Sequence, residues 1–85
     1  MEITVNITKT ITSDNKEFKI GDDIYFHLMR NDKIYDCFGV ITNINEDTFE
    51  IDNVQLDKMN VSDKLTIKYS EIKDGMLHFT DNSWY

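Results

Sequence analysis

The sequence has no alanine and no proline, only three glycines and a single cysteine. Alanine is the best helix former, so its absence removes the residue that most often fills helical faces. One cysteine cannot form an intramolecular disulfide, and no apolar run approaches the roughly 18 residues of a membrane-spanning helix. The first residues also lack the basic stretch and apolar block of a secretory signal. We therefore expect a cytoplasmic domain, without membrane contact, that is held together by its core alone.

The residues that are abundant are those that favour β-strands. Eleven isoleucines stand beside four valines, four tyrosines and five phenylalanines, and β-branched and aromatic side chains suit a pleated, half-buried surface. A length of 85 residues, 40% of them hydrophobic, is enough for one core and too short for two. We therefore expect one all-β domain over residues 1–85.

The charge of the chain is strongly negative. Sixteen acidic residues face nine basic ones, which gives a formal charge of −7. Such a chain repels phosphate backbones and anionic lipid headgroups, so we expect no direct nucleic-acid or membrane binding. The eight asparagines, with frequent Ile, Lys and Asp, are typical of AT-rich coding sequences and suggest a low-GC bacterium or its phages as the source.

Alternation of apolar and polar residues locates the expected strands. They cover residues 3–8 (with the alternation reaching Ile11), 24–29, 34–44, 48–52, 64–69 and 76–80. Polar or glycine-containing turns separate them at 13–17, 30–33, 45–47, 70–72 and 73–75. Gly39 lies inside a long strand, where glycine usually marks a bulge or a bend. Residues 53–63 have a blurred pattern that fits an irregular loop or one helical turn, and we expect the loop.

Three segments together resemble SH3-like small barrels, the superfamily that includes KOW and Tudor domains. They are Lys19 to Phe26 with its Gly-Asp pair, Phe38 to Ile44 with its central glycine, and Thr48 to Ile51. A short turn at 70–72 before the last strand fits the same architecture, and the central hairpin is also similar to the Sm-like fold. The resemblance implies a five- to six-stranded SH3-like barrel, here with an added N-terminal strand.

No catalytic or cofactor-binding arrangement is visible in the sequence. The three glycines lie too far apart for a phosphate-binding loop. Cys37 could meet His27 or His78 across strands, but a buried cysteine and two surface histidines are the commoner arrangement. A metal site needs three or four ligands at workable spacing, and His27 with Cys37 is the single suggestive pair. We therefore expect no enzyme activity, no cofactor and no metal.

The acidic residues of the second half form the first candidate surface. Six of them fall between positions 46 and 63. On a strand, Glu50 and Asp52 would lie about 7 Å apart, close to the spacing of successive phosphates on one nucleic-acid strand. The functional interpretation is a surface that imitates nucleic acid, and the alternative is a solvated face that keeps a small domain soluble. The residues proposed to contact a partner are Glu46, Asp47, Glu50, Asp52 and Asp57.

Aromatic residues form the second candidate surface. If Phe26 and Phe38 face the core, the alternation leaves Tyr25 and Tyr35 partly exposed, and Trp84 lies near the end of the chain. Exposed Tyr and Trp are frequent interface anchors. The alternative is that the C-terminal aromatics cover an open end of the barrel.

These observations favour a non-enzymatic protein-binding module. In its most specific form it is a phage or mobile-element inhibitor whose acidic face occupies the basic groove of a nucleic-acid-binding protein. One alternative is a nucleic-acid-binding barrel of the KOW or Sm type that uses Tyr25 and Tyr35 for stacking. The other is a structural virion component that assembles through free sheet edges. The oligomeric state is expected to be a monomer or a small homo-oligomer.

Overall fold

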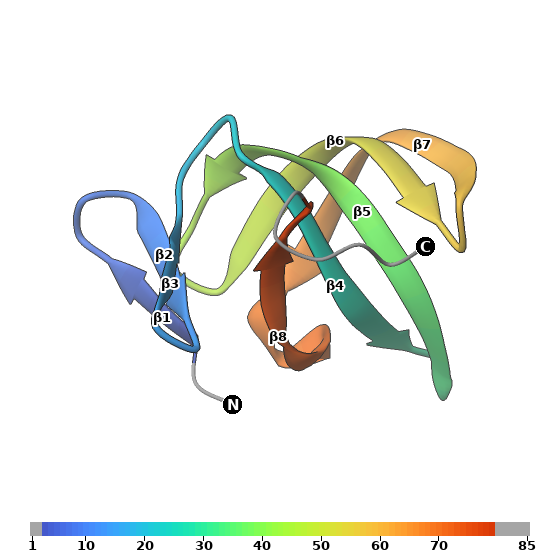
Figure 1. Ribbon diagram of the computed structural model, residues 1–85, viewed down its shortest axis with the longest axis horizontal. Coiled ribbons are helices and arrows are strands. Elements are labelled where there is room, and N and C mark those ends of the chain that lie inside the picture. Colours follow the sequence, from blue (N-terminus) through green and yellow to red (C-terminus); the bar gives the residue numbers. More distant parts are fainter. Residues whose placement is uncertain (1–2, 80–85) are drawn as a thin grey trace.

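Residues 3–79 are described by a computed structural model, and they form eight β-strands and one 3-10 turn in two antiparallel sheets (Figure 1). The all-β class expected from the composition is confirmed. Within these residues, no helix is long and apolar enough to cross a membrane. The elements in chain order are β1 (Ile3–Asn6), β2 (Thr10–Ser13), β3 (Lys16–Phe18), β4 (Asp23–Arg30), β5 (Lys33–Ile44), β6 (Thr48–Leu56), β7 (Met59–Lys68), η1 (Tyr69–Glu71) and β8 (Ile72–His78).

The N-terminal part is a three-stranded sheet in the order β1-β2-β3, not the single added strand that the alternation predicted. The chain turns after Asn6, where the Lys9 amide donates to the Asn6 carbonyl over 3.0 Å and Lys9 adopts a positive φ of 64°. Ile7 continues the apolar pattern but is fully exposed at this turn. The prediction was wrong because an apolar residue at a hairpin tip looks like one more inward-facing strand residue.

The other five strands form a sheet in the order β7-β6-β5-β4-β8. The chain runs through four consecutive hairpin-linked strands, makes the η1 turn, and returns to pair β8 with the first of the four, β4. Within residues 3–79 no ladder joins β7 to β8, so the pairings do not close the expected barrel. The prediction of five to six strands counted this sheet correctly but missed most of the smaller one.

Gly39 marks a bulge in the long strand β5, as the sequence predicted. The pairing register with β6 shifts between Phe38 and Val40. A Cβ atom at Gly39 would lie 2.9 Å from Cδ1 of Ile51 and 3.1 Å from the carbonyl oxygen of Asp52. These distances are too short for an unstrained contact, so glycine lets β6 approach β5 closely at the bulge.

The loop expected over residues 53–63 does not exist. The chain instead continues as strand β6 to Leu56, turns at Asp57 and Lys58 with φ angles of 52° and 70°, and returns as β7. Met59 and Val61 on β7 are 70% and 52% exposed. The apolar spacing was misleading because these two side chains do not face the core.

The expected turn at 73–75 is a bulge inside β8. Asp74 and Gly75 have φ angles of 70° and 92°, and the register with β4 shifts at this point. Directly after it, the Met76 amide donates to the buried Ser13 hydroxyl over 3.1 Å and so connects the two sheets. Both sheets contribute to one buried core, which contains Ile11, Phe18, Ile24, Phe26, Leu28, Cys37, Ile41, Ile44, Phe49, Ile51, Val54, Ile67, Ile72 and Met76.

Candidate functional site

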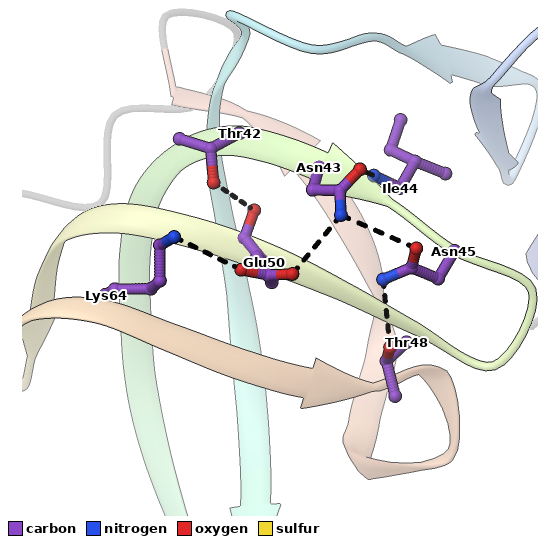
Figure 2. A network of polar contacts seen from close by, with 7 residues as sticks. All are labelled: Thr42, Asn43, Ile44, Asn45, Thr48, Glu50 and Lys64. Carbon is purple, nitrogen blue, oxygen red and sulfur yellow. Dashed lines mark hydrogen bonds and ion pairs between the residues drawn. The ribbon is translucent and has the colours of Figure 1, made fainter.

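The turn between β5 and β6 carries two of the acidic residues singled out in the sequence, Glu46 and Asp47, and both are exposed. Backbone and side-chain bonds fix this acidic turn. The Asn45 amide donates to the Thr48 carbonyl over 2.8 Å, and Asn45 Nδ2 donates to Thr48 Oγ1 over 3.4 Å (Figure 2). The two carboxylates therefore project from a defined backbone.

Tyr69, the first residue of η1, makes two hydrogen bonds to the acidic turn. Its hydroxyl donates to the Asn45 carbonyl over 2.8 Å, and its amide donates to the Asp47 carbonyl over 3.3 Å. The ring stacks on buried Phe49 with a centroid distance of 5.4 Å. Burial, with a further contribution from the Asp47 carboxylate, raises the pKa of the Tyr69 hydroxyl to about 12. Tyr69 therefore stays a neutral hydrogen-bond donor at physiological pH.

A groove runs between the acidic turn, η1 and strand β1. Its volume of about 720 Å³ falls within the range of ~300–1,000 Å³ that is usual for ligand clefts. Ile3 and Val5 on its β1 side are half-buried against the core, whereas Thr4 is exposed. The described residues that line it are Ile3, Thr4, Val5, Glu46, Asp47, Thr48, Lys68, Tyr69 and Ser70.

An ion pair fixes the η1 wall of this groove. Arg30 at the end of β4 donates from Nε to Glu71 Oε2 over 2.7 Å and from Nη2 to Glu71 Oε1 over 2.8 Å. The same Glu71 carboxylate accepts the Lys68 amide over 3.0 Å, and Arg30 also reaches the Thr66 carbonyl over 3.3 Å. Because of these bonds, chiefly that from Arg30, the pKa of Glu71 lies below its ordinary value.

Glu50 and Asp52 lie on the outer face of β6, as predicted, but Glu50 already has partners. Its carboxylate accepts a hydrogen bond from Asn43 Nδ2 over 3.2 Å and lies 3.4 Å from Lys64 Nζ (Figure 2). Asp52 pairs in register with the same Lys64 of β7. A basic side chain of the domain itself therefore offsets the negative charge of this face.

Asp57 serves the β6–β7 hairpin rather than a free acidic surface. Its carboxylate accepts the Asp36 amide over 2.9 Å, and its own amide donates to the Asp36 carbonyl over 2.8 Å. These two bonds attach the hairpin tip to β5. Of the five acidic residues proposed to contact a partner, Glu46 and Asp47 line the groove, whereas Glu50, Asp52 and Asp57 do not.

The prediction for the aromatic residues was wrong for Tyr25. Tyr25 is only 6% exposed, and its hydroxyl contacts His27 Nε2 over 3.2 Å and Asp36 Oδ1 over 3.3 Å. In β5 the side chains that face the core are the opposite of those expected. Tyr35 packs against the core, whereas Phe38 pairs in register with Tyr25 on the other face. Tyr35 is half-buried. Trp84 lies outside the described residues.

The suggested pair of His27 and Cys37 does not form a site. Cys37 is completely buried, and desolvation raises the pKa of its thiol to about 12. His27 pairs in register with Asp36 and lies 3.2 Å from its carboxylate, on the opposite face of the sheet from the core. In the part of the chain that the structure describes, no group of three or more His, Cys, Asp or Glu residues is placed to hold a metal ion.

Comparison of the chain with protein-family models, with curated proteins and with solved structures found no match. The groove and its chemistry are therefore the basis for a functional proposal.

Proposed function

We propose that this chain is a non-enzymatic protein-binding module and that the groove beside the acidic turn is its contact surface. The observation that carries the proposal is the position of Glu46 and Asp47, whose exposed carboxylates stand on a fixed turn at the rim of a cleft of about 720 Å³. Charged groups at the rim of a contact surface steer the partner and select it.

The hypothesis of an acidic surface that imitates nucleic acid takes a narrower form in this proposal. Glu50 is paired with Lys64, and Asp57 accepts a backbone amide, so a row of phosphate-like charges along β6 receives little support. The exposed pair Glu46 and Asp47 instead offers a compact negative site to a protein with a basic surface, such as a nucleic-acid-binding protein. A role as a phage or mobile-element inhibitor is consistent with this chemistry.

We also propose that the five-stranded sheet is an SH3-like unit. Two features support the resemblance: the bulge at Gly39 in its long central strand, and the η1 turn that returns β8 to β4. The nucleic-acid-binding alternative receives less support, because Tyr25, one of its two proposed stacking residues, is buried.

A capture experiment with matched charge variants tests the proposed function. The domain is used as bait in lysates of low-GC bacteria, together with Glu46→Lys/Asp47→Lys and a control, Glu17→Lys/Asp63→Lys. All four substituted residues are exposed, and each pair changes the formal charge from −7 to −3. We expect the groove variant to lose a protein that the control retains. Equal capture by both variants would contradict the proposal, and recovery of nucleic acid in place of protein would favour the alternative.

A further inference from the structure

We propose that the groove accepts an extended, basic segment of the partner, which adds as a strand to the free edge of β1. This inference rests on the proposed function, since it specifies what the groove binds. An extended peptide that adds to a sheet edge gains affinity from main-chain hydrogen bonds and specificity from alternate side chains.

Strand β1 has a free edge and borders the groove. It pairs with β2 on one side, and within residues 3–79 no strand pairs with its other side. Its first three residues line the cleft. Four residues of strand span roughly 13 Å at ~3.3 Å per residue, which is enough to pair with a segment of similar length.

The composition of β1 distinguishes it from the other edge strands. Natural proteins protect exposed edges with charged side chains, bulges or very short strands. Strand β3 has only three residues, two of them charged, β7 carries Lys64 and Lys68, and β8 has the bulge at Asp74 and Gly75. Strand β1 reads Ile-Thr-Val-Asn, so among the edge strands of the described part it alone carries no charge and has no bulge.

The charges around the groove determine the chemistry of the segment. Among the described residues that line the groove, Glu46 and Asp47 are acidic and exposed, and Lys68 is basic. The chain as a whole has a formal charge of −7. A second copy of the domain would bring the same negative charge, whereas a segment with Lys or Arg would be attracted.

Side-chain alternation extends this argument to the pattern of the segment. Along an added strand, successive side chains point to opposite faces. One face would meet the half-buried side chains of Ile3 and Val5, and the other would lie on the side of exposed Thr4, where basic groups can stay in water. We therefore expect β-branched residues that alternate with Lys or Arg.

The groove is already shaped for such a segment. The acidic turn is held by the Asn45–Thr48 bonds, and Tyr69 ties that turn to η1 through two further hydrogen bonds. Little order has to be imposed on these walls when a peptide binds, which lowers the entropic cost of association.

The first test is selection from a phage-displayed library of random short peptides on the purified domain. We expect the selected peptides to alternate Lys or Arg with β-branched residues. The binding of a selected peptide should weaken about tenfold in Glu46→Lys/Asp47→Lys and change little in Glu17→Lys/Asp63→Lys. Selection of no peptide above background, or of peptides without basic residues, would overturn the inference. Concentration-dependent dimerisation of the domain alone, with β1 amides protected from exchange in the dimer, would identify a second copy as the occupant and would also overturn it.

The second test examines backbone pairing directly. A selected peptide is synthesised in two forms, N-methylated at its odd or at its even positions, because in a strand only alternate amides face a given neighbour. We expect one form to lose binding and the other to retain it. Equal affinity of the two forms would overturn strand addition. If the capture experiment succeeds while these tests fail, the groove is still the contact surface and only the strand-addition mode is refuted.

Discussion

The Arg30–Glu71 ion pair joins the end of β4 to η1 and to the last residues of β7, and so holds one wall of the groove. Replacing Glu71 with Gln removes the negative charge but keeps nearly the same side-chain shape. The carbonyl oxygen of Gln can still accept a hydrogen bond without charge assistance, but its NH2 group cannot accept one. At least one of the bonds now made to the two carboxylate oxygens, those from Arg30 at 2.7 and 2.8 Å and from the Lys68 amide at 3.0 Å, is therefore lost.

The expected loss of stability follows from these bonds and from their exposure. A hydrogen bond to a charged group contributes roughly 1.5–3 kcal/mol when well protected. The side chains of Arg30 and Glu71 are 34% and 19% exposed, so solvent screens part of this interaction. We expect Glu71→Gln to reduce the free energy of unfolding by about 1–2 kcal/mol in total, which lowers Tm by roughly 5–15 °C in a domain of this size.

The pH dependence gives the effect a specific signature. The pKa of Glu71 is lowered in the folded chain, mainly by its hydrogen bond from Arg30, relative to an ordinary value of 4.5. Its contribution is therefore complete above about pH 4.5 and is lost as the pH falls through the lower folded value. The difference in Tm between the original chain and Glu71→Gln should be constant near neutral pH and should narrow in acid.

Thermal unfolding followed by circular dichroism, from neutral pH into acid, measures both the loss of stability and its dependence on pH. Glu17→Gln is the matched control, because Glu17 is exposed on β3, and it should change Tm little. A Tm difference for Glu71→Gln that stays the same from neutral pH into acid, or no difference at all, would refute this reasoning.

Three further predictions concern the sheets and the core. Ser13→Ala leaves the buried Met76 amide without its acceptor, so denaturant unfolding should show a loss of about 1–3 kcal/mol, and an unchanged midpoint would contradict a role in joining the sheets. Gly39→Ala places a Cβ atom 2.9 Å from Cδ1 of buried Ile51, so a loss of about 1–3 kcal/mol is expected in the same assay, whereas a stabilised variant would show that the bulge does not require glycine. The Cys37 thiol, buried and with its pKa raised to about 12, should react with Ellman's reagent only after denaturation, and rapid reaction in native buffer would contradict its burial.

Strict alternation with polar turns between the strands made much of the larger sheet predictable. The β4–β5 hairpin and the start of β6 follow this pattern, with Ile24, Phe26, Phe49 and Ile51 all buried. Gly39 could be interpreted as a bulge because glycine inside a strand has few other roles.

The errors arose where tertiary contacts override the local pattern. Ile7 and Met59 are apolar residues that the fold leaves exposed. The sequence pattern therefore did not reveal the first hairpin or the start of β7. Tyr25 is buried although it lies on the outer face of its strand, where its register partners are Phe38 of β5 and Leu77 of β8. The alternation of apolar and polar residues along a strand cannot predict that such a side chain is buried.

The candidate site was predictable only in part for the same reason. Acidic residues at 46 and 47 were visible in the sequence, but their relation to β1 depends on how the small sheet packs against the acidic turn. Tyr69 ends an alternating segment and has no local feature that marks it as the support of a groove. The partners of Glu50 and Asp57 come from neighbouring strands, so the sequence could not distinguish these residues from free carboxylates.

The most direct test of the groove as the contact surface is amide hydrogen exchange of the domain with and without its captured partner. We expect new protection in β1, in the acidic turn at 45–48 and at 68–70, with little change elsewhere. Protection centred on the outer face of β4 and β5, or on the tip of the β6–β7 hairpin, with the amides of β1 unchanged, would contradict it.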